Sequence, residues 1–240
     1  MREFRADLHI HSCLSPCAEL EMSPRSIVQE ARRKGLDIIG ICDHNSAENV
    51  PAVRRSAEKE GIKVIGGIEV TSREEVHILA LFEREEWLFS LQEIIYENLR
   101  GTNNEKLYGE QVVVNEEDEV VGFNKKLLIG ATEIPVEKVV DLTHKLNGLA
   151  IASHVDREGF SIVGQLGFIP DGLALDALEI TDPSGKDRIP GNHGLPFITS
   201  SDAHTLDEIG GRYTCFFMKN ANTAEMKKCF LGEGGREVRI

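Results

Sequence analysis

Short apolar runs alternate with amphipathic segments along the chain. Runs rich in branched apolar residues are typical of buried β-strands and occur at residues 4–9, 37–42, 63–69, 77–82, 149–153, 177–181, 196–199 and 213–218. Apolar residues recur at helical spacing at residues 24–34, 50–59, 85–99, 135–148 and 223–231. This alternation predicts an α/β protein built from βα units around a mostly parallel sheet.

Residues 102–130 interrupt the alternation. Two short β-rich runs, at residues 111–114 and 119–123, flank an acidic turn and predict a small hairpin. No Pro- or Gly-rich linker separates this segment from the rest of the chain. We therefore expect a single domain over residues 1–240, with residues 102–130 as an insertion on its core.

Composition narrows the class of protein. The chain has 240 residues, 41% of them hydrophobic, which is enough for one sizeable core. It lacks the run of roughly 18 apolar residues that a membrane-spanning helix needs. The sequence does not open with an apolar signal core, and its five cysteines are odd in number and scattered. We therefore expect a cytoplasmic protein with reduced thiols and no membrane partner.

The chain is strongly acidic. It carries 27 basic and 40 acidic residues, for a net charge of −13. Such a surface argues against strong non-specific binding to duplex DNA, which depends on cationic neutralisation of phosphates. An anionic substrate remains compatible with this charge, because bound divalent cations can reverse its sign locally.

Residues of the kinds that bind metals follow the predicted strands. His9 and His11 end the first strand, and residues two apart on a strand point to the same side. Other strands end near further candidate ligands, which are His44, Glu69, His154, Asp202 and His204. Any one of these could be a hydrogen-bonded loop residue, and His9 and His11 could be a solvated pair. Because the carboxyl ends of parallel strands meet at one mouth of a barrel, the whole set predicts a polynuclear metal site there.

The other histidines fit this pattern less well. His77 begins its strand instead of ending it, which on pattern alone favours a structural role. His144 lies on the amphipathic segment 135–148, and His193 precedes a strand, so we expect both to be structural.

The motifs that carry these residues resemble those of a known family. The chain contains, in this order, DLHIHS, CDHNS, GIEVTS followed by VHIL, ASHVDR, and SSDAH. These motifs span residues 7–204 and are similar to those of the PHP (polymerase and histidinol phosphatase) superfamily. The resemblance implies a distorted (β/α)7 TIM-like barrel. Two or three divalent metal ions, of zinc, manganese or iron, would be held at the carboxyl-terminal mouth of its strands.

The resemblance also implies a role for each motif residue. Glu69 would bridge two metals, and His77 becomes a ligand despite its place at the start of a strand. The full set of implied metal ligands is His9, His11, His44, Glu69, His77, His154, Asp202 and His204. Asp7 and Asp43 stand beside ligands, and we expect them to orient imidazoles instead of binding metal.

Cys17 is the one departure from the family pattern. It stands where related proteins usually carry an Asp or a His, in the stretch Ser15-Pro16-Cys17-Ala18. A thiolate is a good zinc ligand, so Cys17 could hold a third metal together with His44 and His204. Alternatively, Cys17 is a buried thiol and the third metal site is weak or absent.

The predicted chemistry is hydrolysis by metal-activated water. The sequence has no P-loop and no Gly-x-Ser-x-Gly elbow. We therefore expect a metal-bound hydroxide, held by Glu69, His9, His11 and Asp202, to attack a phosphate ester. Cationic anchors for the substrate phosphate are predicted at Arg157, Arg188 and Lys186. The sequence does not identify the group that would protonate the leaving alkoxide as general acid.

The leading hypothesis is a phosphoesterase that hydrolyses a phosphomonoester of a small molecule, a nucleotide or a short oligonucleotide. A histidinol-phosphate phosphatase is an alternative within the same family. A non-catalytic metal-binding module is an alternative of another class, and the nearly complete ligand set argues against it. A metal-dependent amidohydrolase would need a carboxylated lysine on a strand, for which the chain has no good candidate. The sequence is compatible with a homo-oligomer but does not define one.

Overall fold

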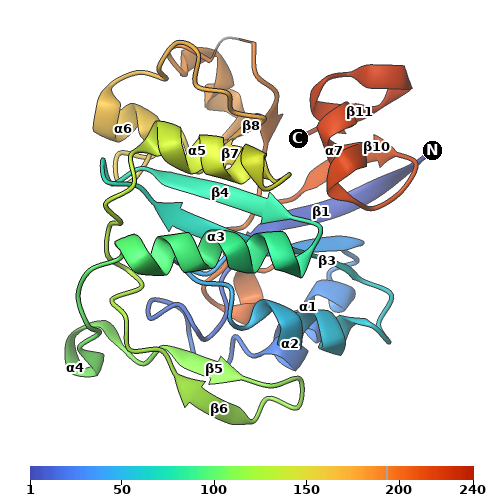
Figure 1. Ribbon diagram of the computed structural model, residues 1–240. Coiled ribbons are helices and arrows are strands. Elements are labelled where there is room, and N and C mark those ends of the chain that lie inside the picture. Colours follow the sequence, from blue (N-terminus) through green and yellow to red (C-terminus); the bar gives the residue numbers. More distant parts are fainter. Residues whose placement is uncertain (193) are drawn as a thin grey trace.

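A barrel-like sheet dominates the structure, a computed structural model that describes residues 1–192 and 194–240 (Figure 1). Among these residues, one sheet has nine strands in the order β11-β10-β1-β2-β3-β4-β7-β8-β9, and β5 pairs only with β6. The strands are β1 (Arg2–Ile10), β2 (Ile38–Ile41), β3 (Lys63–Thr71), β4 (His77–Phe82), β5 (Val112–Val114), β6 (Val120–Phe123), β7 (Leu149–Ala152), β8 (Ala177–Glu179), β9 (Phe197–Ile198), β10 (Thr214–Met218) and β11 (Glu237–Arg239).

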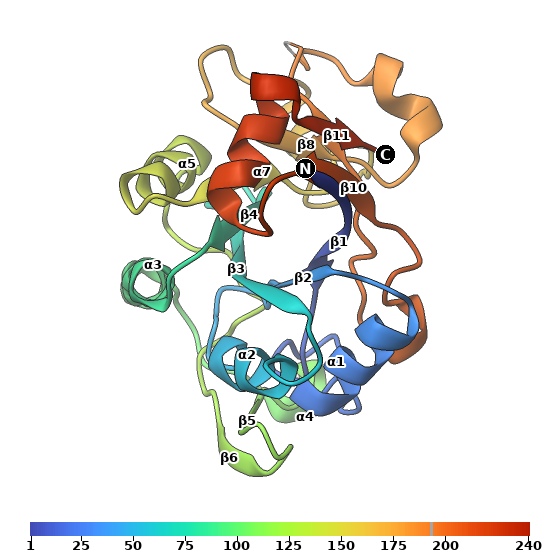
Figure 2. The same cartoon turned by 90° about the vertical axis from the view of Figure 1, so that its right-hand side faces the viewer.

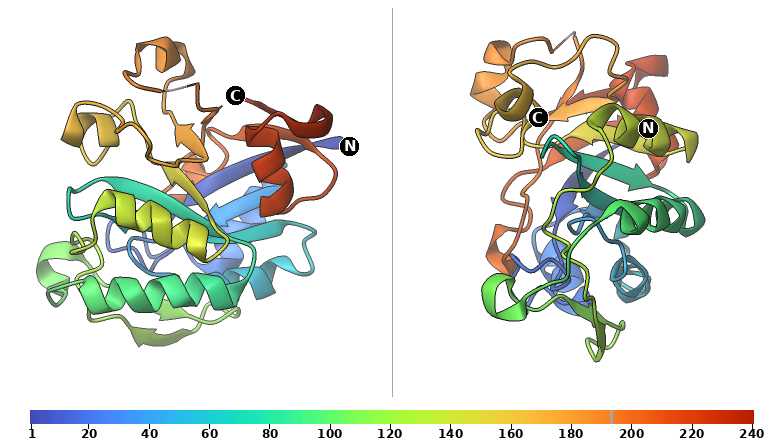
Figure 3. Two further views of the ribbon diagram at one scale, coloured as in Figure 1. Left: turned by 45° about the horizontal axis from the view of Figure 1, so that its top comes forward. Right: turned by 60° about the vertical axis from the view of Figure 1, so that its left-hand side comes forward.

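Helices cover the outside of this sheet, with α1 and α2 beside β2 and β3, and α3 and α5 beside β4 (Figures 2 and 3). The helices are α1 (Pro24–Arg33), α2 (Val50–Ala57), α3 (Glu85–Asn98), α4 (Glu105–Tyr108), α5 (Val136–Lys145), α6 (Ile162–Leu166) and α7 (Thr223–Phe230), with short 3-10 turns η1 (Pro183–Arg188), η2 (Leu206–Glu208) and η3 (Glu233–Gly235). In the described part of the chain, none of these helices is long and apolar enough to cross a membrane.

The sheet curls until its two ends meet. The segment after β9 returns to β10, where the backbone N–H of Thr199 donates to Oγ1 of Thr214 at 2.8 Å. Further along, Ala203 forms a parallel bridge with Ile10 at the end of β1. The predicted TIM-like barrel is therefore confirmed, with β10 added antiparallel beside β1 and β11 antiparallel beside β10.

β4 runs against its neighbours. It pairs antiparallel with both β3 and β7, and only the short turn between Thr71 and His77 joins it to β3. Its first residue therefore lies at the same mouth as the last residues of the parallel strands. This reversal explains why His77 begins its strand and still reaches the predicted site.

Two apolar cores separate the faces of the sheet. The outer core packs strand residues such as Ile39 and Ile78 against α1, α2, α3 and α5. The inner core fills the barrel with residues such as Leu79 and Leu149 and includes Met226 of α7. Because side chains alternate along a strand, Leu79 points inward and Ile78 outward.

The side chains of β1 change the face of the sheet to which they point just before the predicted site. Leu8 belongs to the inner core and Ile10 to the outer core, although the two are only two residues apart. The pairing of β1 with β2 shifts register between Asp7 and Ile10, as a β-bulge does. With Ile10 facing outward, the flanking His9 and His11 face the barrel interior.

The predicted hairpin in residues 102–130 is present. β5 and β6 pair antiparallel (Figure 1), and Val112 of β5 donates its backbone N–H to the carbonyl oxygen of Cys13, in the loop that follows β1, at 3.1 Å. Asn45 fastens the end of the insertion, because its Nδ2 donates to the carbonyl oxygens of Leu128 and Gly130, each at 2.8 Å. Its Oδ1 accepts from the backbone N–H of Thr71 at 3.1 Å. The insertion is therefore tied to the loops that carry the site.

Candidate metal centre

The carboxylate of Glu69 lies at the centre of the predicted ligands. It is 1% exposed and projects inward from β3. Its Oε1 lies 2.8 Å from Nδ1 of His77, 3.3 Å from Nε2 of His154 and 3.4 Å from Nε2 of His9. Its Oε2 lies 3.1 Å from Nδ1 of His44 and 3.4 Å from Nε2 of His11. One carboxylate therefore faces imidazoles from several strands with both oxygens, as a bridging ligand must.

Asp202 completes one side of this cluster. Its Oδ1 lies 3.3 Å from Nε2 of His9 and 3.2 Å from Nε2 of His11, and those two nitrogens are 3.1 Å apart. His9, His11 and Asp202 thus place one donor atom each within 4.8 Å of one another. His44, Glu69 and His77 form a second group of the same kind.

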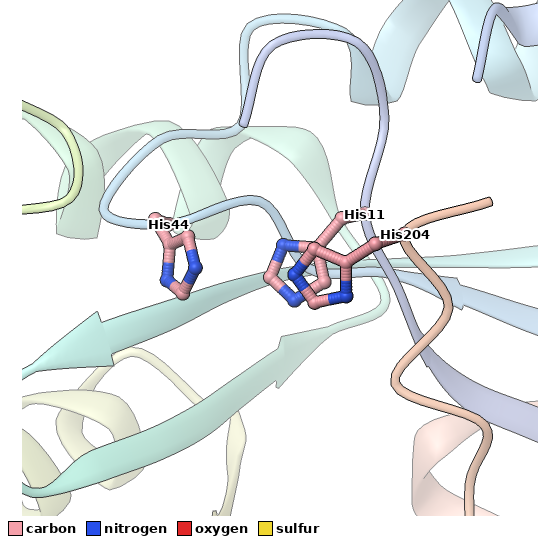
Figure 4. A group of neighbouring side chains, drawn as sticks. All are labelled: His11, His44 and His204. Carbon is pink, nitrogen blue, oxygen red and sulfur yellow. The ribbon is translucent and has the colours of Figure 1, made fainter. Parts of the chain in front are cut away.

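A third group consists of histidines alone. His11, His44 and His204 also converge within 4.8 Å, and Figure 4 shows their rings coming from three separate segments of the chain. The ring of His204 stacks on that of His11 at 4.3 Å between centroids. Nδ1 of His204 bonds the backbone oxygen of Asp202 at 2.8 Å, so Nε2 is the nitrogen that a metal would bind. This group contains His44 and His204, the two histidines predicted for a third metal site, with His11 beside them.

Cys17 lies in the wall of the same pocket and is exposed, not buried. Partial loss of water around its sulfur raises the pKa of the thiol, but hydrogen bonds with His204 and His44 lower it to about 7. A thiol with that pKa is about half in the thiolate form near neutral pH. Its role as a metal ligand stays a prediction.

The donor set fits divalent metals. Among the described residues, Nδ1 of His44, Nδ1 of His77, Nδ1 of His154 and Oε1 of Glu69 are buried and have no well-oriented hydrogen bond. Buried polar atoms are rarely left in this state unless something else satisfies them. Imidazole and carboxylate donors suit zinc, manganese and iron. The metal ligands predicted from the motifs are therefore gathered in an arrangement that can hold metal ions.

Burial and neighbouring charges shift the pKa of the Glu69 carboxyl in opposite directions. Burial raises the pKa of the Glu69 carboxyl, but the imidazoles of His77, His9 and His44 hold it well below its usual range. Burial lowers the pKa of His11 to about 3, so this imidazole is neutral and has a lone pair for a metal. The centre thus combines an ionised carboxylate with at least one neutral imidazole.

Glu179 provides a carboxylate that supports the site, and the sequence analysis did not predict it. It is 2% exposed on β8, and its Oε2 lies 3.0 Å from Nδ1 of His9 and accepts from the backbone N–H of His154 at 3.1 Å. Such a partner fixes the orientation of a ligating imidazole. Alternation along residues 177–181 places Glu179 on the inward face with Ala177 but does not reveal its partner.

The two aspartates beside the ligands have different tasks. Asp43 accepts from Oγ of Ser15 at 2.7 Å, and that hydroxyl bonds Nδ1 of His11 at 2.9 Å, so Asp43 orients this imidazole indirectly. Asp7 contacts the backbone instead, where it accepts from the N–H groups of Ser201 and Gly210, each at 2.9 Å. It therefore holds the loop that presents Asp202.

The predicted phosphate anchors differ in their distance from the centre. Arg157 lines the metal pocket, which has a volume of about 250 Å³, and its Nη1 bonds Oδ2 of Asp202 at 2.6 Å. Arg188 lines an adjoining cavity of about 520 Å³, and Arg157 also forms part of that wall. Lys186 is exposed on η1 and belongs to neither lining. Arg157 is thus the predicted anchor nearest the ligands.

His144 was expected to be structural, and it lies outside the group of candidate ligands. His144 lies on α5, where its Nε2 bonds Oδ2 of Asp176 at 2.8 Å, away from the metal pocket. His193 lies outside the described residues.

Comparison with known proteins establishes the family. The model described as PHP domain matches residues 7–161, and the one described as PHP-associated matches residues 188–228. Because the first match covers more than half of the 240 residues, the chain belongs to the PHP domain family. The resemblance inferred from the motifs is therefore confirmed.

The individual proteins that match this chain are only distantly similar to it. A 5'-3' exoribonuclease of Haemophilus influenzae is 31% identical over 78 residues, which is 31% of this chain and 27% of that protein. The uncharacterized protein YqxK of Bacillus subtilis is 22% identical over 99% of this chain and 64% of its own length. The lesion-specific endonuclease PfuEndoQ of Pyrococcus furiosus superposes with a TM-score of 0.75 at 22% identity, over 98% of this chain and 57% of that one. The chain therefore spans less than two thirds of each of these proteins.

Proposed function

We propose that this chain is a metal-dependent phosphoesterase that hydrolyses a phosphomonoester of a nucleotide, another small molecule or a short oligonucleotide. The observation that carries the proposal is the convergence of histidines from several strands on the buried carboxylate of Glu69, beneath a pocket that also contains Arg157. Membership of the PHP domain family supports the same class of chemistry.

The ligand residues would bind and position divalent metal ions. Such ions activate water as a nucleophile near neutral pH and neutralise charge on a phosphate. Glu69 would bridge neighbouring ions through its two oxygens, while His9, His11 and Asp202 would hold one of them. Glu179 and Ser15 keep the imidazoles of His9 and His11 in place while the reaction proceeds.

Arg157 would bind the substrate phosphate. Its side chain is 38% exposed, so part of the guanidinium faces solvent at the pocket while Nη1 stays bonded to Asp202. A guanidinium in this position can bond oxygens of a phosphate and share its charge with the metal ions. Arg188 would add a second positive charge to a substrate long enough to reach the adjoining cavity.

The size of the pocket favours a small reacting group. About 250 Å³ accommodates a terminal phosphate and part of its leaving group, and the walls come from several loops. The net charge of −13 also favours small or short substrates over long duplex DNA. These two features support the phosphomonoester over a bond within a long polymer.

The test is a phosphatase screen on metal-loaded protein. The panel spans nucleoside monophosphates and bisphosphates, 5'-phosphorylated oligonucleotides, sugar phosphates and histidinol phosphate, and phosphate release is measured. Release from at least one ester, abolished by chelation and by Glu69→Gln, is expected. Turnover of histidinol phosphate alone would instead favour that phosphatase. Full metal occupancy with no turnover of any ester would favour a non-catalytic module.

A further inference from the structure

An exposed aromatic ring stands at the edge of the metal pocket. Phe160 is 44% exposed and lines the pocket together with Arg157 and Ile129. The part of a large apolar side chain that stays in contact with water gains nothing from the hydrophobic effect in the free protein. The ring is therefore placed where an incoming ligand can cover it.

The backbone holds Phe160 in an uncommon conformation. Its φ is +57°, in the left-handed region that bulky residues rarely adopt, and Gly159 stands immediately before it. The carbonyl oxygen of Phe160 accepts from the backbone N–H of His77 at 2.8 Å, which fastens the loop to the start of β4. Such strained positions concentrate at ligand-binding sites.

The ring also has a fixed orientation. It stacks on the imidazole of His77 at 4.7 Å between centroids, with 20° between the two planes. Nδ1 of His77, a candidate ligand, lies 2.8 Å from Oε1 of Glu69, so the stacked pair extends from the metal centre to the pocket edge. The part of the ring not covered by His77 accounts for its exposure.

The neighbouring groups define what the ring would recognise. Arg157, three residues earlier on the same loop, provides a cation for phosphate, and Ile129 provides a second apolar contact. An aromatic platform beside a phosphate-binding group matches a nucleobase and its phosphate. A sugar phosphate without a base would leave the ring uncovered.

We propose that Phe160 is a specificity-determining residue whose ring stacks on the base of a nucleotide, so that the pocket selects nucleoside phosphates over phosphate esters without an aromatic group. This inference rests on the proposed function for the place of the phosphate and deepens it by naming the substrate class. A purely structural role, in which Phe160 only shields His77, would give no such selectivity.

Equilibrium binding tests the platform without requiring turnover. The affinities of AMP and ribose 5-phosphate for the metal-loaded protein are measured by titration calorimetry. Wild-type protein should bind AMP about tenfold or more tightly than ribose 5-phosphate, which is within the usual contribution of one stacked base. Phe160→Ala should reduce the affinity for AMP by about tenfold and leave that for ribose 5-phosphate unchanged, while Phe160→Tyr should keep the wild-type ratio.

Two controls separate stacking from a structural effect. Phe168→Ala removes another exposed phenylalanine, 55% exposed and outside the pocket lining, and should change neither affinity. Phe160→Leu keeps an apolar side chain against His77 without an aromatic face, so its metal content should equal that of the wild type. The ratio of the two affinities in Phe160→Leu decides the case even if Phe160→Ala loses metal.

The inference is overturned if wild-type protein binds both compounds equally. It is also overturned if Phe160→Leu weakens both to the same extent or preserves the preference for AMP. Selective AMP binding with no hydrolysis of any ester would contradict the proposed function alone. Hydrolysis of esters with no preference for nucleotides would contradict the platform alone.

Discussion

At the residue scale, the motif residues were predictable because their chemistry is unusual. His9 and His11 stand two apart at the end of a strand, and several other strands also end near residues of the kinds that bind metals. Glu179 was missed because one carboxylate within an apolar strand resembles an ordinary buried polar residue until its partner His9 is located in space. Asn45 was missed for the same reason, since the carbonyl groups that it binds lie in the distant insertion.

Glu179→Gln tests the support of His9. The change removes the negative charge beside Nδ1 of His9 but keeps the shape of the side chain. Because outer partners of ligating histidines typically contribute 10- to 100-fold, we expect metal affinity or activity to fall by about that factor. Zinc titration against a competing chelator measures the affinity. Glu225→Gln, a similarly buried carboxylate paired with Arg236, is the control and should leave zinc affinity unchanged.

Cys17→Ala tests the third metal site. If the thiolate is a ligand, metal analysis should find about one equivalent less than in wild-type protein, because the remaining imidazoles leave that ion under-coordinated. Cys215→Ala, on β10 and outside the pocket, serves as the matched control. An unchanged metal count would remove Cys17 from the ligand set and leave the group of His11, His44 and His204 on its own.

Metal binding should depend on pH. Burial lowers the pKa of His44, but Glu69 and Cys17 raise it to about 10, and the carboxylates around His9 raise its pKa well above the usual value. A raised pKa means that these imidazoles are protonated near pH 7 in the metal-free protein, and coordination must release the protons. Zinc affinity should therefore increase with pH. Calorimetry at pH 7 in two buffers with different ionisation enthalpies measures the release, and identical enthalpies in both would show that no proton leaves.

At the scale of elements, the strands and helices were predictable from apolar periodicity, and their orientation was not. Residues 77–82 read as one more strand of a parallel sheet, yet β4 is antiparallel because only a short turn connects it to β3. A parallel connection needs a crossover of a dozen residues or more. The short elements α4, α6 and β11 carry too few residues for a periodic signal. The bulge in β1 has no sequence signature apart from a glycine on the neighbouring strand.

That glycine gives an element-scale prediction. A Cβ on Gly40 would lie 2.3 Å from the carbonyl oxygen of Leu8, at the register shift that turns His9 inward. Gly40→Ala should therefore lower the free energy of unfolding by about 2 kcal/mol or more, since overpacking of this kind typically costs about 1–3 kcal/mol. Urea denaturation measures the change.

Gly122→Ala is the matched control within a strand. A Cβ on Gly122 of β6 would have no atom within 4 Å, so the midpoint of unfolding should stay near that of wild-type protein. Equal midpoints for Gly40→Ala and the wild type would show that β1 does not need this close approach. Metal affinity measured on the folded fraction of Gly40→Ala should also decrease, because the bulge positions His9.

At the scale of the whole molecule, the barrel brings distant segments to one mouth. His9 and Asp202 are separated by most of the chain, and Ala203 lies beside Ile10 only because the sheet curls closed. Motif order could indicate this arrangement, but the distances between donor atoms required the fold. The chain is acidic overall, but metal ions and Arg157 would supply positive charge locally in the pocket. An anionic substrate can then bind there.

The central claim is that metals held around Glu69 hydrolyse phosphate esters. The most direct measurement titrates metal-free protein with Mn²⁺ or Zn²⁺ and follows bound metal and phosphate release from a nucleoside phosphate in the same samples. We predict that release starts from background, rises as the sites fill and levels off at two to three equivalents, about the number that a polynuclear centre of this kind holds. Release that is independent of bound metal, or full occupancy without release from any ester in the panel, would contradict the account.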